Sequence, residues 1–144
     1  MTIAQYIAKL DAKLAKLRQG HWVELAAIDT HDAMSQRIFV DNQNVSGKTF
    51  KYKPYTVKKK KDKGHRYDRV TFKDTNDLQL DFNNNKKVTK ENAFVYKINL
   101  KRDRNVQVSK SLDKRYSFVF KIKKSEIAIF RQSAETNFKL IMAS

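Results

Sequence analysis

Apolar residues recur with the period of an α-helix at both ends of this chain and alternate with polar residues, as in strands, in the middle. This difference between the ends and the middle constrains the possible folds more than any other feature of the sequence. Near the N-terminus apolar residues recur at spacings of three, four and seven, which predicts an amphipathic helix with the stripe Ile3, Tyr6, Ile7, Leu10, Leu14 and Leu17. Gly20 interrupts this pattern, and a second helix is predicted over roughly Trp22 to Phe39. A last helix is predicted from about Ser125, with the stripe Ile127, Phe130, Ala134, Phe138 and Ile141.

In the middle of the chain, apolar side chains alternate with polar ones, which is typical of strands. The two clearest strands are predicted at Phe94 to Leu100 and at Tyr116 to Ile122, and shorter ones at Val70 to Phe72, Leu78 to Phe82 and Val106 to Val108. We therefore expect an α+β fold, in which two N-terminal helices and one C-terminal helix flank an antiparallel sheet of four to five strands. The length of 144 residues favours a single domain over 1–144.

The apolar stripes on the terminal helices are expected to lie in the core, and Trp22 is expected to anchor the packing of helices on the sheet. The stripe of the first helix is long for a core of this size. An alternative is that part of this stripe binds a partner.

Positive charge is concentrated in one segment. The formal net charge is +16, and residues 48–73 contain 11 basic and 2 acidic residues. Residues 41–69 lack apolar periodicity, so we expect residues 48–69 to form a long extended basic arm or hairpin inserted within the domain. Aromatic side chains lie among its lysines, a pattern that favours contact with a polyanion or with another subunit. The predicted contact residues are Phe50, Tyr52, Tyr55, Lys58, Lys59, Lys60, Lys61 and Arg66. A solvated loop is the alternative interpretation.

The sequence contains no convincing constellation for catalysis, so we expect no enzyme. It has no cysteine, which excludes disulfides, thiol catalysis and Cys-ligated metals. Its three glycines are isolated, so neither a phosphate-binding loop nor a dinucleotide-binding motif is present, and we expect no cofactor. No apolar run reaches the ~18–20 residues of a membrane span, and no secretory signal is visible.

Two groups of titratable residues resemble candidate sites. His31 lies close in sequence to Asp29 and Asp32, so it could act as a catalytic base that one of these carboxylates orients. We expect instead that His31 is a solvated side chain on the polar face of its helix. A second group, Asp74, Asp77 and Asp81, lacks the glycine and the terminal glutamate of a calcium loop. We expect these carboxylates to lie in a turn and on a strand face, so no metal site is predicted.

From Gly47 onward the order of motifs resembles the head–tail joining and tail-completion proteins of tailed bacteriophages, the virion morphogenesis group. The shared elements are a Gly-x-x-aromatic turn, a basic Tyr/Lys loop, a short Thr-containing element, alternating strands, an Arg-aromatic step and a C-terminal helix. They fall here at Gly47 to Phe50, Tyr52 to Lys63, Val70 to Leu78, Phe94 to Leu100, Arg115 to Phe120 and the helix from Ser125. One departure is that Thr75 and Asn76 stand where the family usually has Thr-Gly. Asn tolerates positive φ next best after Gly.

This resemblance implies a structural virion protein that forms a ring in the neck, as a head–tail connector, or in a tail-completion complex. Its expected partners are other copies of itself, neighbouring portal, adaptor or tail proteins, and DNA in the channel, with no membrane. The expected localisation is the virion, after assembly in the host cytoplasm. The alternative from another functional class is a small basic nucleic-acid-binding protein that uses the Lys/Tyr-rich arm, with an affinity that falls steeply with salt.

Overall fold

The structure is a computed structural model, and it describes residues 1–65, 77–84, 89–92, 94–97 and 100–144. The helices in these residues are α1 (Ile3–Arg18), α2 (His21–Ser35), the π-helical turn η1 (Gln36–Val40), α3 (Pro54–Asp62), α4 (Asp77–Asn84), α5 (Asp103–Tyr116) and α6 (Lys124–Ala143). The strands are β1 (Thr89–Asn92) and β2 (Val95–Lys97). The prediction of a four- to five-stranded sheet is therefore wrong, because the described residues are mostly helical and form a single two-stranded antiparallel sheet.

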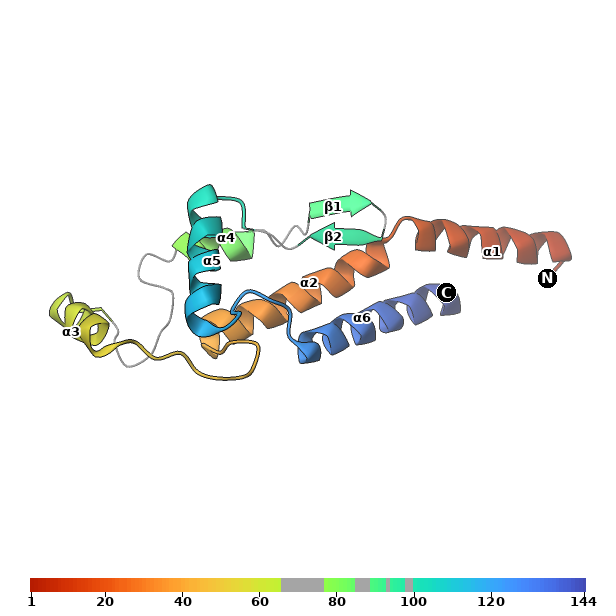
Figure 1. Ribbon diagram of the computed structural model, residues 1–144. Helices are drawn as coiled ribbons and strands as arrows, with labels where there is room; N and C mark the ends of the chain where they lie inside the picture. Colours follow the sequence, from red (N-terminus) through yellow and green to blue (C-terminus); the bar gives the residue numbers. More distant parts are fainter. Residues whose placement is uncertain (66–76, 85–88, 93, 98–99) are drawn as a thin grey trace.

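The predicted helices at both ends of the chain are confirmed. α1 begins with a capping box, in which the Thr2 hydroxyl accepts from the Gln5 amide and the Gln5 side chain accepts from the Thr2 amide. Gly20 adopts a left-handed conformation (φ 73°) between α1 and α2, which lets the chain turn between the two helices. α6 runs antiparallel along α2 (Figure 1).

The core lies where η1, α4 and the segments beside α5 meet, away from α1 (Figure 1). Its buried apolar side chains are Met34, Ile38, Phe39, Phe50, Leu78, Phe82 and Val119. Aromatic rings pack at its centre, with Phe82 5.7 Å from Phe39 and 6.0 Å from Phe120 between ring centroids. Trp22 lies outside this cluster, where its ring meets Phe94 and Phe138 edge-on.

Two segments that were predicted as strands are helical. Leu78 and Phe82 are four residues apart, so on α4 they lie on one face and are both buried, whereas Leu80 is exposed. The predicted strand at Val106 to Val108 lies inside α5. The period-two pattern was compatible with a short helix at Leu78 to Phe82, where packing of one helix face decided between the two structures.

The predicted strand from Tyr116 to Ile122 is also absent. α5 continues to Tyr116, and Ser117 and Phe118 then both take positive φ values of 60° and 63°, which breaks the extended backbone that a strand requires. The burial does not alternate: Val119 is fully buried, Tyr116 and Phe120 pack against the core, and Phe118 and Ile122 are exposed.

The strand prediction at Phe94 to Leu100 is confirmed for three residues, since Phe94 lies in a turn and Leu100 is outside the strand. Val95–Lys97 forms β2, and it pairs antiparallel with β1 in the register Thr89 to Lys97, Lys90 to Tyr96 and Asn92 to Val95. The predicted strand at Val70 to Phe72 lies outside the described residues.

The basic segment is not extended throughout, because residues 54–62 form α3. Pro54 occupies the first helical turn, where its fixed φ and missing N–H cost nothing. Gly64, at φ 70°, ends the helix: its amide donates to the Lys61 carbonyl (3.1 Å) and the His65 amide donates to the Lys60 carbonyl (2.9 Å). These two bonds form a Schellman motif.

Candidate interaction surfaces

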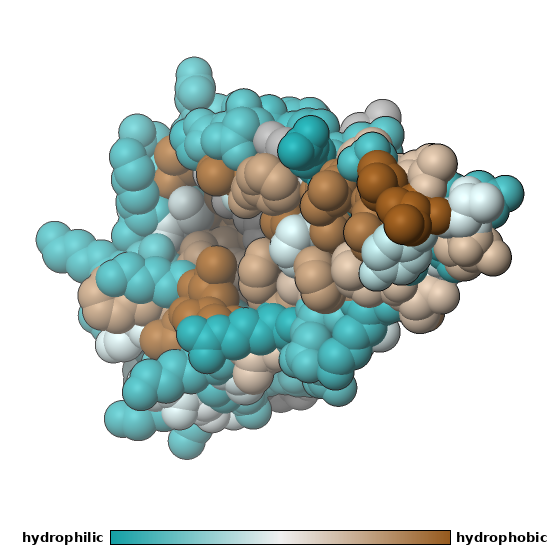
Figure 2. Space-filling view, turned by 90° about the vertical axis from the view of Figure 1, so that its right-hand side faces the viewer, coloured by the Kyte–Doolittle hydropathy of each residue, from teal (hydrophilic) through white to brown (hydrophobic). Residues whose placement is uncertain are grey.

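Helix α1 presents an apolar stripe to solvent. None of its 16 residues is buried. Five of its six large apolar side chains are between 37% and 81% exposed, and Leu17 is half-buried; the five are Ile3, Tyr6, Ile7, Leu10 and Leu14. Figure 2 faces this end of the molecule and shows apolar residues gathered on its surface. We call these five residues the α1 stripe.

The α1 stripe is only partly covered by the rest of the chain. Figure 1 shows α1 extending past the C-terminal end of α6. The Lys13 ammonium donates a hydrogen bond to the Met142 carbonyl, which fixes the two helices side by side at this point. α1 has four basic residues and one acidic residue, and these are Lys9, Lys13, Lys16, Arg18 and Asp11. The stripe therefore has an apolar centre with positive flanks.

The structure divides the predicted contact residues of the basic segment between interior and surface. Phe50 belongs to the core, with its ring centroid 5.0 Å from that of Tyr116. Tyr52 is half-buried, and the buried side chain of Lys60 places its ammonium 4.7 Å from the centroid of the Tyr52 ring. These aromatic side chains anchor the segment to the domain.

The other predicted contact residues are accessible on α3. Tyr55 is 74% exposed, and Lys58, Lys59 and Lys61 are exposed as well. Arg66 lies outside the described residues. Figure 1 places α3 at the opposite end of the molecule from α1. The molecule thus has a lysine-rich end and an apolar end.

His31 is buried, so the prediction of a solvated side chain is wrong. Its ring stacks on Phe82 at 4.5 Å between centroids and 13° between planes, and its Nε2 lies 2.9 Å from the Phe82 carbonyl oxygen, which accepts the hydrogen bond. Asp32 is on the surface, with Oδ1 4.0 Å from His31 Nδ1. This arrangement packs α2 against α4.

Asp81 is buried, not on a strand face as predicted. Its carboxylate accepts hydrogen bonds from the backbone amides of Lys101 and Arg102 (3.2 and 3.1 Å) and from the Asn105 side chain (2.9 Å). Burial raises the pKa of Asp81, but these hydrogen bonds and the Arg102 charge outweigh it, so the pKa is lowered from its ordinary value of 3.8. The carboxylate thus ties the two residues before α5, and Asn105 in its first turn, to α4.

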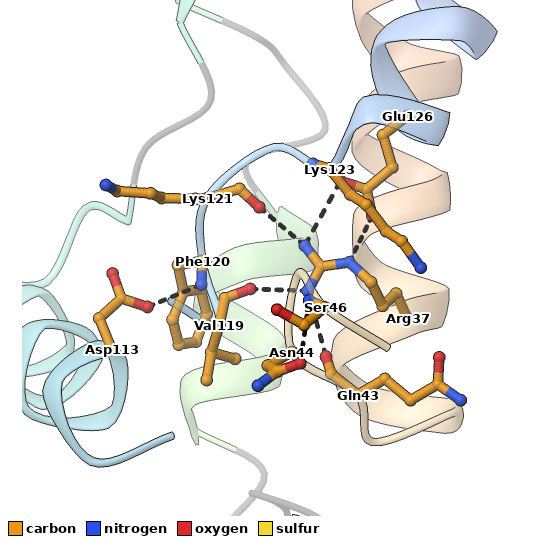
Figure 3. A network of polar contacts seen from close by, with 10 residues as sticks. All are labelled: Arg37, Gln43, Asn44, Ser46, Asp113, Val119, Phe120, Lys121, Lys123 and Glu126. Atoms are coloured by element: carbon orange, nitrogen blue, oxygen red, sulfur yellow. Dashed lines mark hydrogen bonds and ion pairs between the residues drawn. The ribbon is translucent and has the colours of Figure 1, made fainter. Parts of the chain in front are cut away.

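Sequence reasoning missed a buried ion pair at the centre of the molecule, between Arg37 on η1 and Glu126 on α6 (Figure 3). The Arg37 Nε lies 2.5 Å from Glu126 Oε1. Its remaining N–H groups donate to the carbonyls of Gln43 (3.1 Å), Val119 (2.8 Å) and Lys121 (2.8 Å). Arg37 lies at helical spacing from Met34 on an otherwise apolar face, and this was the available signal.

The network gives Arg37 a structural role. Glu126 also accepts a hydrogen bond from the Lys123 amide (2.7 Å), so both charges are surrounded by partners. The guanidinium thereby holds the irregular connection between α5 and α6 against η1 (Figure 3).

Among the described residues, no group of three or more histidine, aspartate or glutamate side chains is placed to hold a metal ion, and no helix is long and apolar enough to cross a membrane. Comparisons of the chain with protein-family models, curated proteins and solved structures give no match.

Proposed function

We propose that this protein is a structural, non-enzymatic subunit of a ring in the neck or tail-completion complex of a tailed-bacteriophage virion. One structural observation carries the proposal beside the sequence resemblance: the α1 stripe and the lysines of α3 are unlike surfaces at opposite ends of the molecule (Figure 1). In a heterologous contact, one surface of a subunit binds a different surface of the next, and repetition of this contact forms a ring when the rotation from subunit to subunit closes. The α1 stripe supplies one side of such a contact, and the lysines at the other end stay available for an acidic partner or DNA.

The size of the stripe also favours assembly through more than one contact. Full burial of a large apolar side chain contributes about 1.5–3 kcal/mol, and the five side chains of the stripe are already about half buried. Covering the stripe therefore contributes roughly 4–8 kcal/mol. Association itself costs about 4–15 kcal/mol, so a pair held by the stripe alone is weak. In a ring each subunit makes two contacts, one with each neighbour. The second contact offsets part of the free-energy cost of association.

The charges that flank the stripe disfavour a symmetrical pair of α1 helices. In such a pair each contact occurs twice, so Lys9, Lys13 and Lys16 of the two copies would be brought close together. Like charges in an interface reduce affinity. We therefore propose that the stripe binds a different part of the next subunit.

The proposed surroundings follow from this role. The ring assembles in the host cytoplasm and joins the virion, where portal, adaptor or tail proteins cover its two faces. The lysine-rich end of each subunit then faces an acidic neighbour or the DNA in the channel.

A second candidate function is binding of nucleic acid by the free protein. The observation that favours it is the exposed ring of Tyr55 beside the exposed lysines of α3, since stacking on aromatic rings together with phosphate neutralisation is how proteins bind single strands. This candidate predicts a stoichiometric complex with an oligonucleotide at 0.15 M salt that dissociates at 0.5 M. The ring proposal predicts little affinity for free DNA at 0.15 M salt.

Crosslinking from the stripe tests the ring proposal directly. The chain has no cysteine, so an Ile3→Cys variant carries one thiol, which is labelled with a photoreactive benzophenone maleimide. The matched control is Ala8→Cys, which lies on the opposite side of the same helix and is also exposed. Crosslinked peptides are identified by mass spectrometry.

The proposal predicts intermolecular crosslinks from position 3 to peptides outside residues 1–18, and none from position 8. Crosslinks that join only the α1 helices of two copies would indicate a symmetrical dimer. That result, or the absence of any intermolecular crosslink from position 3, would contradict the proposed head-to-tail contact.

A further inference from the structure

One face of α3 and the turn that follows it line a small, open basic pocket. The pocket has a volume of about 220 Å³ and is lined by Thr56, Lys59, Lys60, Lys63 and His65. The first four residues are spaced three, four and seven apart, so their side chains lie on the same face of the helix. Sequence reasoning singled out the lysine run but not this face.

The Schellman motif brings His65 into the pocket. Because Gly64 adopts the left-handed conformation, the chain folds back and the His65 amide reaches the Lys60 carbonyl at 2.9 Å. The carbonyls of Lys59, Lys60 and Lys61 all accept hydrogen bonds from backbone amides of residues 63–65. The lysine ammonium groups are thus not required to cap the end of the helix.

The side chains around the pocket supply hydrogen-bond donors and positive charge. Lys59 and Lys63 each carry three N–H donors, and Thr56 and His65 add an O–H and a ring N–H. Within the described residues neither Lys59 nor Lys63 forms an ion pair, and no carboxylate lines the pocket. The buried Lys60 ammonium, held over the Tyr52 ring, adds to the positive potential.

We propose that this pocket binds a phosphate group of a polynucleotide backbone. Its volume is below the ~300–1,000 Å³ of pockets for drug-sized ligands, which favours a compact anion. A tetrahedral phosphate accepts hydrogen bonds from several directions. The donors on the helix face and on the following turn approach the pocket from different directions and suit such an anion. Lysines act on phosphate as point charges, without base readout. The inference goes beyond the proposed ring and does not depend on it.

One such pocket is a weak site. Non-specific binding of proteins to DNA has a Kd of about 10⁻⁴–10⁻⁶ M at physiological salt, and it arises from several phosphate contacts. A single subunit is therefore expected to bind DNA measurably only at low salt. In the virion, where the channel holds the DNA close to the ring, the pockets of successive subunits contact one duplex together.

The test compares two charge-matched double variants of the full-length chain. Lys59→Gln with Lys63→Gln removes two ammonium groups from the pocket. Lys58→Gln with Lys61→Gln removes two from the opposite side of α3. Binding of a fluorescein-labelled 12-base-pair duplex is followed by fluorescence anisotropy between 20 and 150 mM NaCl. Circular dichroism checks that both variants keep the helical content of the unmodified protein.

We expect the pocket variant to bind the duplex at least tenfold more weakly at 20 mM NaCl, and its salt slope to fall by roughly one phosphate contact. The opposite-face variant is expected to lose less than about threefold, through its reduced overall charge. Equal losses in the two variants, or no binding of the duplex to the unmodified protein at 20 mM NaCl, would overturn the proposal.

Two further measurements distinguish the source of the anion. Inorganic phosphate alone, added at constant ionic strength, is expected to shift the His65 ring resonances in NMR spectra only at much higher concentration than the duplex does. Equal shifts by phosphate and duplex at equal phosphate concentration would contradict a polynucleotide site. A poly-glutamate peptide that binds as tightly as the duplex, with the same loss in the pocket variant, would show instead that the pocket takes an acidic protein.

Discussion

Arg37 and Glu126 form a buried ion pair in which every N–H direction of the guanidinium meets an oxygen of the carboxylate or of a backbone carbonyl (Figure 3). The pair joins η1 to the first turn of α6, and the three carbonyls belong to segments that have no regular secondary structure. A hydrophobic side chain in place of Arg37 would satisfy none of these groups.

Replacement of Arg37 is therefore expected to be costly. Arg37→Met leaves the Glu126 carboxylate buried without its partner, and we expect the free energy of unfolding to fall by about 3–5 kcal/mol. The double variant Arg37→Met with Glu126→Met removes both charges and should recover a large part of this loss. Urea denaturation of the two single variants and the double variant measures the coupling. Additive losses would contradict the role assigned to the pair.

Asp81 is expected to make stability depend on pH. Because its pKa in the folded protein is lowered, its stabilising contribution is present above the unfolded value of 3.8 and is lost as pH falls through the folded pKa. Asp81→Asn should therefore cost about 1–3 kcal/mol at pH 7 and progressively less below about pH 4. Urea denaturation from pH 3 to pH 7 tests this. Asp11→Asn, at an exposed position on α1, is the control and should show no comparable loss.

Ser117 is strained, since a residue other than glycine costs about 1–2 kcal/mol in the left-handed region. Ser117→Gly is expected to raise the free energy of unfolding by roughly 1 kcal/mol. The same substitution at the exposed position Ser111, inside α5, should lower it by about 0.5 kcal/mol. Thermal or urea denaturation decides the sign at each position. A loss of stability in Ser117→Gly would show that the turn has another conformation.

The α1 stripe should affect association and not folding. Ile7→Ser with Leu10→Ser reduces the apolar area of the stripe, whereas Ala8→Ser with Ala12→Ser introduces the same residue on the opposite face of α1. We expect the first pair to weaken self-association at least tenfold in sedimentation velocity, and the second to leave it within about threefold. Both should keep the unfolding midpoint of the core, because α1 has no buried residue. Equal effects on association would contradict a contact through the stripe.

Helices at the ends of the chain were predictable because their apolar residues recur over several turns, as Leu10 and Leu14 do in α1. The strands were predicted from short alternations, and Leu78 and Phe82 fit such an alternation and a helical face equally well. The alternation from Tyr116 to Ile122 does not form a strand, because two successive positive φ values at Ser117 and Phe118 turn the chain. A hydropathy pattern contains no information about such a turn.

The candidate surfaces were predictable in part. The lysine run of α3 and the length of the α1 stripe were visible in the sequence. The stripe was expected in the core, but it is exposed, which favours the alternative that part of it binds a partner. The burial of Phe50 and His31 was not visible, because it depends on contacts with Tyr116 and Phe82, more than 50 residues away in the chain. The basic pocket depends on the turn at Gly64, which returns His65 to the helix face.

The most direct test of the proposed function is the native mass of the unmodified protein in 0.15 M salt, measured by light scattering over a hundredfold range of concentration. The account predicts one closed oligomer, whose mass is a fixed multiple of 16.9 kDa and does not increase once the ring is complete. A monomer at every concentration would contradict the proposed ring, as would a mass that keeps rising with concentration, because a head-to-tail contact that does not close forms open polymers.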